Sequence, residues 1–189
     1  PMADHPADAP FRVGIIGAGN ISDAYLKISR GFAVYEVLSI ADLDEKRAEV
    51  QAERHGVRAQ SVAALLEDDL DIIVNLTVPA VHAEVSRAIL AAGKHVYSEK
   101  PLATSRADGQ ALVAFAAERG LRIGCAPDTF LGAGLQTCRA LLDAGLVGEP
   151  IAATAFMMSS GPERWHPNPA FFYQPGAGPL FDMGPYYLT

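Results

Sequence analysis

A glycine-rich segment near the N-terminus has the spacing of a diphosphate-binding loop. Gly17 and Gly19 are followed by Ser22, in the order Gly-x-Gly-x-x-Ser. The first glycine permits a tight turn, the second lets the backbone approach a diphosphate, and the third position needs a small residue. The pattern predicts dinucleotide contacts from Gly17, Gly19, Asn20 and Ile21. A glycine turn without a ligand is the alternative, because this pattern alone is weak.

An acidic residue, Asp42, follows about 20 residues beyond this loop, where a dinucleotide's ribose would lie. Its carboxylate could accept hydrogen bonds from both ribose hydroxyls and would repel a 2′-phosphate. Leu43 and Asp44 come next, so no arginine directly follows to bind such a phosphate. Asp42 therefore predicts NAD as the cofactor in preference to NADP. The alternative is a solvated carboxylate at the end of a strand.

Further polar residues follow the apolar stretch 71–76. We expect Asn75, Thr77 and Pro79 to contact the cofactor, because ligands bind outside the carboxyl ends of parallel strands. His82 lies on the helix expected to begin at Pro79. A structural hydrogen bond and a role in the site are equally compatible with its position.

A lysine follows the next apolar stretch, in the order Glu99, Lys100, Pro101. At a strand end facing the crevice, Lys100 could polarise a substrate hydroxyl or carbonyl. Pro101 would fix the local turn, with a cis peptide bond as one option. From composition alone, a surface lysine is the more common case.

The elements that must hold these residues alternate between strand and helix. Apolar stretches predict strands at residues 12–16, 37–41, 71–76, 95–98 and 121–125. Helical patterns occupy residues 20–30, 44–55, 62–67, 79–92 and 105–119. This alternation predicts an α/β fold, a Rossmann-type doubly wound parallel sheet with helices on both faces. The carboxyl ends of its strands would bring the polar residues to one edge.

The pattern changes after residue 126. A helix is expected at 131–144, a strand at 151–157, a loop at 161–179 and a helix at 180–188. We therefore divide the chain into a flexible tail (1–10), an NAD(P)-binding Rossmann domain (11–126) and the start of an incomplete α/β C-terminal domain (127–189). A lone strand cannot form a core, and its apolar face invites association. We expect a chain truncated in this second domain.

Composition excludes several classes of protein. The 189 residues are 50% hydrophobic and carry a formal charge of −7 without a basic cluster, which argues against nucleic-acid binding. No signal peptide and no membrane-spanning apolar run is visible, so we expect a cytoplasmic protein that does not bind membranes. Cys125 and Cys138 match no metal-ligand spacing, and buried thiols are the favoured interpretation. No metal is expected.

Taken together, four motifs resemble the Gfo/Idh/MocA oxidoreductases, the family of glucose-fructose oxidoreductase and inositol dehydrogenase. The resemblance covers nearly all of residues 11–189. The motifs lie at residues 17–22, 75–79 with His82, 93–103 and 176–186. The resemblance implies hydride transfer between a nicotinamide and a hydroxyl-bearing carbon of a sugar or cyclic polyol. It also implies a substrate domain that forms the interface of a homo-oligomer when the protein has its full length.

The family's functional residues map onto three positions of this chain. The resemblance implies that Lys100 orients the substrate and tunes proton transfer. Lys100 and Glu99 beside it are also expected among the cofactor contacts. Asp182 would bind the substrate. Four positions later many members have a histidine as the general acid/base, whereas this chain has Tyr186, a residue that serves this role in some relatives; plain packing is the alternative. Trp165 and His166 are weaker pocket candidates. A nucleotide-binding module without turnover is the alternative function.

Overall fold

The computed structural model describes residues 9–164, 166–174 and 176–189. Contacts within the chain divide it into two compact units, with the boundary between Cys125 and Ala126. Residues 1–8 of the expected tail lie outside the described residues, as does Trp165.

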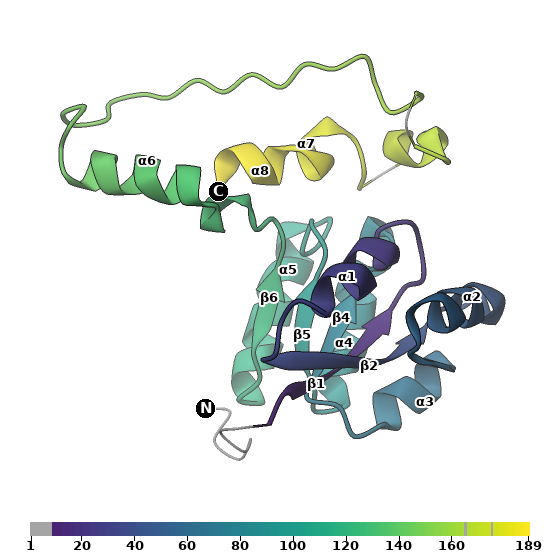
Figure 1. Ribbon diagram of the computed structural model, residues 1–189. Helices are drawn as coiled ribbons and strands as arrows, with labels where there is room; N and C mark the ends of the chain where they lie inside the picture. Colours follow the sequence, from purple (N-terminus) through teal and green to yellow (C-terminus); the bar gives the residue numbers. More distant parts are fainter. Residues whose placement is uncertain (1–8, 165, 175) are drawn as a thin grey trace. The chain divides into compact units, whose positions relative to one another are not determined.

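A parallel sheet of six strands forms the centre of the first unit, in the order β3-β2-β1-β4-β5-β6 (Figure 1). In that order the strands are Arg58–Gln60, Tyr35–Ala41, Phe11–Ile16, Ile72–Asn75, His95–Ser98 and Ile123–Cys125. The chain winds outward in one direction from β1 to β3 and then restarts beside β1 at β4. The strand order is that of a Rossmann fold, with its switch point between β1 and β4. The fold predicted from the alternation of elements is confirmed.

Five α-helices cover the two faces of this sheet. They are α1 (Ser22–Ser29), α2 (Glu45–His55), α3 (Val62–Glu67), α4 (His82–Ala91) and α5 (Arg106–Glu118). On one face Ile15 and Ile40 pack with Leu26 of α1 and with residues of α2. On the other face the next residue of β1, Ile16, packs with residues of α3, α4 and α5, including Leu90. Successive side chains of a strand point to opposite faces, so a sheet covered on both sides needs continuous apolar strands.

The third strand of the chain, β3, is absent from the sequence prediction. It has only three residues, Arg58–Gln60, and none of them is fully buried. It pairs at the edge of the sheet with the end of β2, from Ser39 to Ala41. Such a short polar edge strand leaves no apolar run in the sequence, so backbone pairing alone reveals it.

In the second unit, all of the regular secondary structure that the structure describes is helical. It contains the short 3₁₀ helices η2 (Thr129–Leu131) and η3 (Pro169–Tyr173) and the α-helices α6 (Ala133–Asp143), α7 (Pro179–Asp182) and α8 (Gly184–Leu188). The single helix expected at 180–188 is thus two, because Pro185 begins a new first turn.

The strand expected at residues 151–157 is wrong. These residues have no regular secondary structure, and Ile151 and Phe156 are 95% and 75% exposed. A strand requires a neighbour for its backbone hydrogen bonds, and no strand is found among the described residues of this unit. Apolar alternation alone is therefore insufficient to predict a strand here.

No helix in the described ranges has the length and apolar character needed to cross a membrane.

Candidate functional site

Three neighbouring strands, β1, β4 and β5, bring the predicted residues to one edge of the sheet. Ile16 at the end of β1 pairs with Asn75 at the end of β4, and Asn75 pairs with Ser98 at the end of β5. The glycine loop, the Asn75–Thr77 turn and the Glu99–Lys100 segment therefore start side by side. The switch point of an open α/β sheet is where such folds bind ligands.

The glycine loop has the backbone geometry that its sequence predicts. Gly17 has a φ of +112°, and a Cβ there would lie 2.6 Å from the carbonyl carbon of Leu76. At Gly19, by contrast, a Cβ would meet no atom within 4 Å. The first glycine is thus required by the fold, whereas the second leaves open space in front of the backbone. That open space fits the close approach of a diphosphate.

Helix α1 begins directly after this loop, at Ser22. The Ser22 side chain is fully buried, and its Oγ donates to the carbonyl of Gly19 at 2.7 Å. A small residue is needed at this position, and serine meets that need while fixing the loop by a hydrogen bond. Asn20 and Ile21 are exposed at the start of the helix, where backbone N–H groups and the helix dipole favour an anion.

Asp42 lies at the end of β2 and contacts the glycine loop. Its Oδ2 accepts the backbone N–H of Ala18 at 2.7 Å, and its Oδ1 accepts that of Asp44 at 2.9 Å. Each carboxylate oxygen keeps further lone pairs for a ribose hydroxyl. The residue therefore has a structural role that the sequence did not indicate, in addition to the predicted ribose contact.

Asn75 is completely buried and uses its whole amide group within the fold. Its Nδ2 donates to the carbonyl of His82 at 3.1 Å and to Ser86 Oγ at 3.0 Å. Its Oδ1 accepts from the backbone N–H and the hydroxyl of Thr77, at 3.2 and 2.6 Å. Asn75 thus shapes the turn that leads to η1 (Pro79–Val81), the short 3₁₀ helix in which Pro79 is the first residue.

His82 connects two of the strand-end segments. Its side chain is 1% exposed, with Nδ1 2.6 Å from the carbonyl oxygen of Pro101 and Nε2 2.9 Å from that of Thr77. A neutral imidazole can donate to one of these carbonyls, whereas an imidazolium donates to both. Of the two interpretations left open by the sequence, this geometry supports the structural hydrogen bond.

Glu99 is held at both its backbone and its side chain. Its N–H donates to the carbonyl of Asn75 at 2.9 Å, and its Oε1 accepts the hydroxyl of Tyr25 at 2.9 Å. Its Oε2 accepts the backbone N–H of Lys100 at 3.0 Å. Tyr25 belongs to α1, so this carboxylate joins the helix behind the glycine loop to the lysine segment. Lys100 is half-buried, and its peptide bond to Pro101 is cis.

The two cysteines differ, although both were expected to be buried. Burial, with a smaller contribution from the charge of Glu99, raises the pKa of Cys125 to about 12, so this thiol stays protonated. Cys138 is exposed on α6, a helix without a buried residue, and the expectation is wrong for this position. The described residues contain no group of His, Cys, Asp and Glu side chains that could hold a metal ion.

Two of the three predicted catalytic residues lie in the second unit. Asp182 is the last residue of α7, Tyr186 lies within α8, and both are half-buried. His166 packs edge-to-face on Phe172, with 4.8 Å between ring centroids. Lys100 belongs to the first unit, so a reacting centre formed by all three residues stays a prediction.

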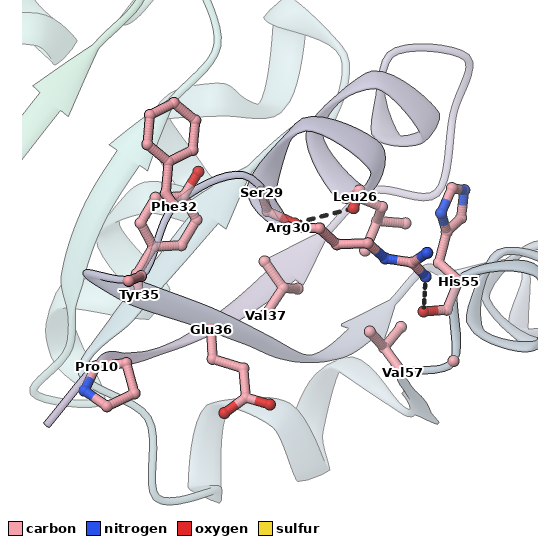
Figure 2. Close-up of a pocket in the computed structure, with 12 residues that line it drawn as sticks. Pro10, Leu26, Ser29, Arg30, Phe32, Tyr35, Glu36, Val37, His55 and Val57 are labelled. Atoms are coloured by element: carbon pink, nitrogen blue, oxygen red, sulfur yellow. Dashed lines mark hydrogen bonds between the residues drawn. The ribbon is translucent and has the colours of Figure 1, made fainter.

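A cavity of about 450 Å³ lies at the opposite edge of the sheet (Figure 2). It is lined at the amino ends of β1 and β2 and at the carboxyl ends of α1 and α2. Arg30 reaches across it to donate to the carbonyl of His55 at 2.5 Å, and Ser29 Oγ donates to Leu26. Arg30 and Ser29 thus donate to backbone carbonyls of the fold, and none of the predicted site residues lines this cavity.

Known proteins resemble this chain over the site just described. The sequence model of the Gfo/Idh/MocA oxidoreductases, described as having an NAD-binding Rossmann fold, matches residues 11–126. A dTDP-3,4-didehydro-2,6-dideoxy-alpha-D-glucose 3-reductase from Actinomadura kijaniata is 37% identical over 97% of this chain and 56% of its own length. An inositol 2-dehydrogenase from Saccharopolyspora erythraea is 32% identical over 82% of this chain and 47% of its own. The chain therefore spans about half the length of these curated relatives.

Among solved structures, a 3-ketoreductase from Actinomadura kijaniata in complex with NADP superposes with a TM-score of 0.67. It is 36% identical, over 74% of this chain and 46% of that one. Variants of that ketoreductase with a lysine or a tyrosine replaced have also been solved. Strand order, glycine loop and sequence agree, and the chain belongs to the Gfo/Idh/MocA oxidoreductase family with its NAD-binding Rossmann fold.

Proposed function

We propose that this protein transfers a hydride between a nicotinamide dinucleotide and a hydroxyl-bearing carbon of a sugar-like or cyclic polyol substrate. The observation that carries the proposal is that β1, β4 and β5 end at the same side of the sheet, so that the open backbone at Gly19 and the segment of Lys100 follow the two strands that flank β4. The sugar reductase and the inositol dehydrogenase among its relatives support the substrate class.

The dinucleotide would lie on the glycine loop, with its diphosphate at Gly19 and the start of α1. When bound, it supplies or accepts the hydride, and the protein supplies placement and proton transfer. Lys100 would polarise the reacting oxygen, Asp182 would bind the substrate, and Tyr186 would exchange the proton as general acid/base. The solved ketoreductase has been studied as variants with a lysine or a tyrosine replaced, the same residue types as Lys100 and Tyr186.

The choice between NAD and NADP is a finer part of the proposal. The carboxylate of Asp42 carries the charge that repels a 2′-phosphate, so we expect NADH to bind roughly tenfold more tightly than NADPH. The solved ketoreductase is in complex with NADP, so the affinities of this protein for NADH and NADPH have to be measured side by side. Fluorescence titration with both cofactors measures it, and tighter binding of NADPH would refute the role given to Asp42.

Substitution of Lys100 by methionine tests the reaction. We expect turnover to fall about 100-fold, because general acid–base contributions are of that order. Lys27→Met, at an exposed lysine of α1, is the matched control and should keep wild-type turnover. The assay panel contains myo-inositol and nucleotide-linked keto sugars as candidate substrates, and the absorbance of the reduced cofactor is the readout. Turnover of Lys100→Met within a factor of two of wild type would refute the assignment.

The second candidate function is nucleotide binding without turnover. It is supported by the site itself, since the glycine loop and its partners all lie within the first unit. Cofactor binding without turnover of any substrate in the panel would favour this function. Assembly into a homo-oligomer and a cytoplasmic location stay predictions, which light scattering and cell fractionation test.

A further inference from the structure

The hydroxyl of Tyr25 makes a contact that connects two separate parts of the site. Tyr25 lies in the first turns of α1, and its Oη donates to Glu99 Oε1 at 2.9 Å across 74 positions of sequence. Strand β4 separates β1 from β5 in the sheet, so this hydrogen bond joins segments that follow non-adjacent strands. The contact therefore relates the helix behind the glycine loop directly to the segment after β5.

The carboxylate of Glu99 passes this constraint on to Lys100. Its second oxygen, Oε2, accepts the Lys100 backbone N–H at 3.0 Å. Hydrogen bonds to an ionised acceptor are stronger than those between neutral groups. With Tyr25 on one oxygen and Lys100 on the other, rotation of the carboxylate would break at least one bond.

The backbone of Glu99 is fixed independently of this carboxylate. Its N–H donates to the carbonyl of Asn75 at 2.9 Å, and its carbonyl accepts from Ser98 Oγ at 3.0 Å. Loss of the Tyr25 hydroxyl would therefore release the carboxylate without displacing the strand end. The ring of Tyr25 packs with the apolar cluster that contains Ala18 and Leu76, and phenylalanine preserves that packing.

We propose that Tyr25 is a positioning residue, which acts through Glu99 to fix the backbone of Lys100 when a dinucleotide holds the start of α1. The importance of Lys100 rests on the proposed function, whereas the link from Tyr25 to Lys100 is tested separately. The link gives the dinucleotide a route to the lysine that needs no direct contact between them. Glu99 thereby acts as a connector between the two segments, besides its predicted contact to the cofactor.

Amide hydrogen exchange at Lys100, measured by NMR, tests the link without turnover. In ligand-free protein, Tyr25→Phe should speed exchange of the Lys100 amide about fivefold, and Glu99→Ala should speed it at least as much. The double variant should be no faster than Glu99→Ala alone, because both substitutions break one pathway. Tyr35→Phe is the matched control, since Tyr35 lies at the start of β2 and stacks on Phe32. Unchanged exchange at Lys100 in Tyr25→Phe, with native circular dichroism, overturns the link.

The same measurement with saturating cofactor, NADH or NADPH, whichever binds more tightly, tests the coupling. In the wild type and in Tyr35→Phe the cofactor should slow exchange at both Ala18 and Lys100. In Tyr25→Phe it should still slow Ala18 fully but slow Lys100 clearly less than in the wild type, because any slowing that remains comes from the predicted direct contacts of Glu99 and Lys100 with the cofactor. Equal slowing at Lys100 in wild type and Tyr25→Phe would overturn the positioning role. If neither cofactor binds the wild type, the proposed function and the coupling both fail, while the ligand-free comparison still decides the link.

Discussion

Alanine substitutions at Gly17 and Gly19 should separate the needs of the fold from those of the ligand. Both residues belong to one loop, and both would gain the same methyl group. At Gly17 that methyl would lie 2.6 Å from both the carbonyl carbon and the oxygen of Leu76, on a backbone with φ of +112°. At Gly19 it would meet no atom of the protein within 4 Å.

The expected cost at Gly17 follows from two contributions. A non-glycine residue in a left-handed conformation costs about 1–2 kcal/mol. Overpacking against backbone, which cannot move aside as a flexible side chain would, adds about 1–3 kcal/mol. The free energy of unfolding should thus fall by about 2–5 kcal/mol in Gly17→Ala, and the melting temperature by roughly 8–20 °C. Gly19→Ala should leave stability within about 1 kcal/mol of wild type.

Cofactor affinity should be lost in Gly19→Ala, the variant whose stability is expected to be close to that of wild type. In Gly19→Ala the methyl group projects into the space proposed for the diphosphate, so the affinity for NADH should fall at least tenfold, which is about 1.4 kcal/mol. Differential scanning fluorimetry gives the melting temperature, and fluorescence titration gives the dissociation constant. Wild-type affinity in a folded Gly19→Ala variant would refute the assignment of this loop to the diphosphate. A melting temperature for Gly17→Ala equal to wild type would refute the steric argument.

Three further predictions concern groups outside the glycine loop. Because burial raises the pKa of Cys125 to about 12, iodoacetamide at pH 8 should alkylate exposed Cys138 at least 100-fold faster than Cys125. Equal labelling of the two cysteines in native protein, mapped by mass spectrometry, would contradict this. Burial, and then the charge of Arg122, lower the pKa of His95 below 6.5. Below pH 6.5 the unfolded chain therefore binds more protons at His95 than the folded chain does. The contribution of His95 to the free energy of unfolding is complete above pH 6.5 and declines as the pH falls below that value. Replacement by glutamine should flatten the loss of melting temperature between pH 7 and 5, and an unaltered slope would exclude this source. Finally, His82→Phe leaves at least one buried carbonyl, of Pro101 or Thr77, without its donor. It should lower the free energy of unfolding in urea by about 1–3 kcal/mol, and a loss below 0.5 kcal/mol would show that these contacts contribute little.

The sequence was sufficient for the order of the long elements in the first unit. Apolar stretches such as residues 13–16 of β1, all of them buried, are unmistakable when both faces of a sheet are covered. Helix ends are equally legible where glycine adopts a left-handed conformation, as Gly56 does after α2 with φ of 65°. The edge strand Arg58–Gln60 could not be predicted, because its three residues, two of them polar, are too few to show a periodicity.

The strand wrongly expected at 151–157 has the opposite cause. Its apolar alternation is a genuine local signal, but a strand is defined by hydrogen bonds to a neighbour that the local sequence does not contain. Ile151 and Phe156 are apolar and nevertheless exposed. Local pattern therefore predicts which residues suit a sheet, whereas the sheet itself depends on residues elsewhere.

For the site, the sequence identified residues correctly placed at one edge but did not reveal what they contact. Asp42, Asn75, His82 and Glu99 were all candidates for the cofactor site, and the side chain of each is hydrogen-bonded to a backbone group of the protein. A motif cannot distinguish these roles, because a group that accepts or donates to a ligand suits a backbone partner equally well.

The contact between Tyr25 and Glu99 is visible in the structure and could not be predicted from the sequence. No spacing rule connects two residues 74 positions apart, and neither residue type is unusual in its own segment. Only the order of strands, with β4 between β1 and β5, brings α1 over the segment after β5. Substitutions at Asp42 or Asn75 should then disturb both the strand-end turns and the cofactor, whereas removal of a single hydroxyl at Tyr25 should change the transmission between them and leave both in place. The amide of Lys100 is the group at which that difference can be measured.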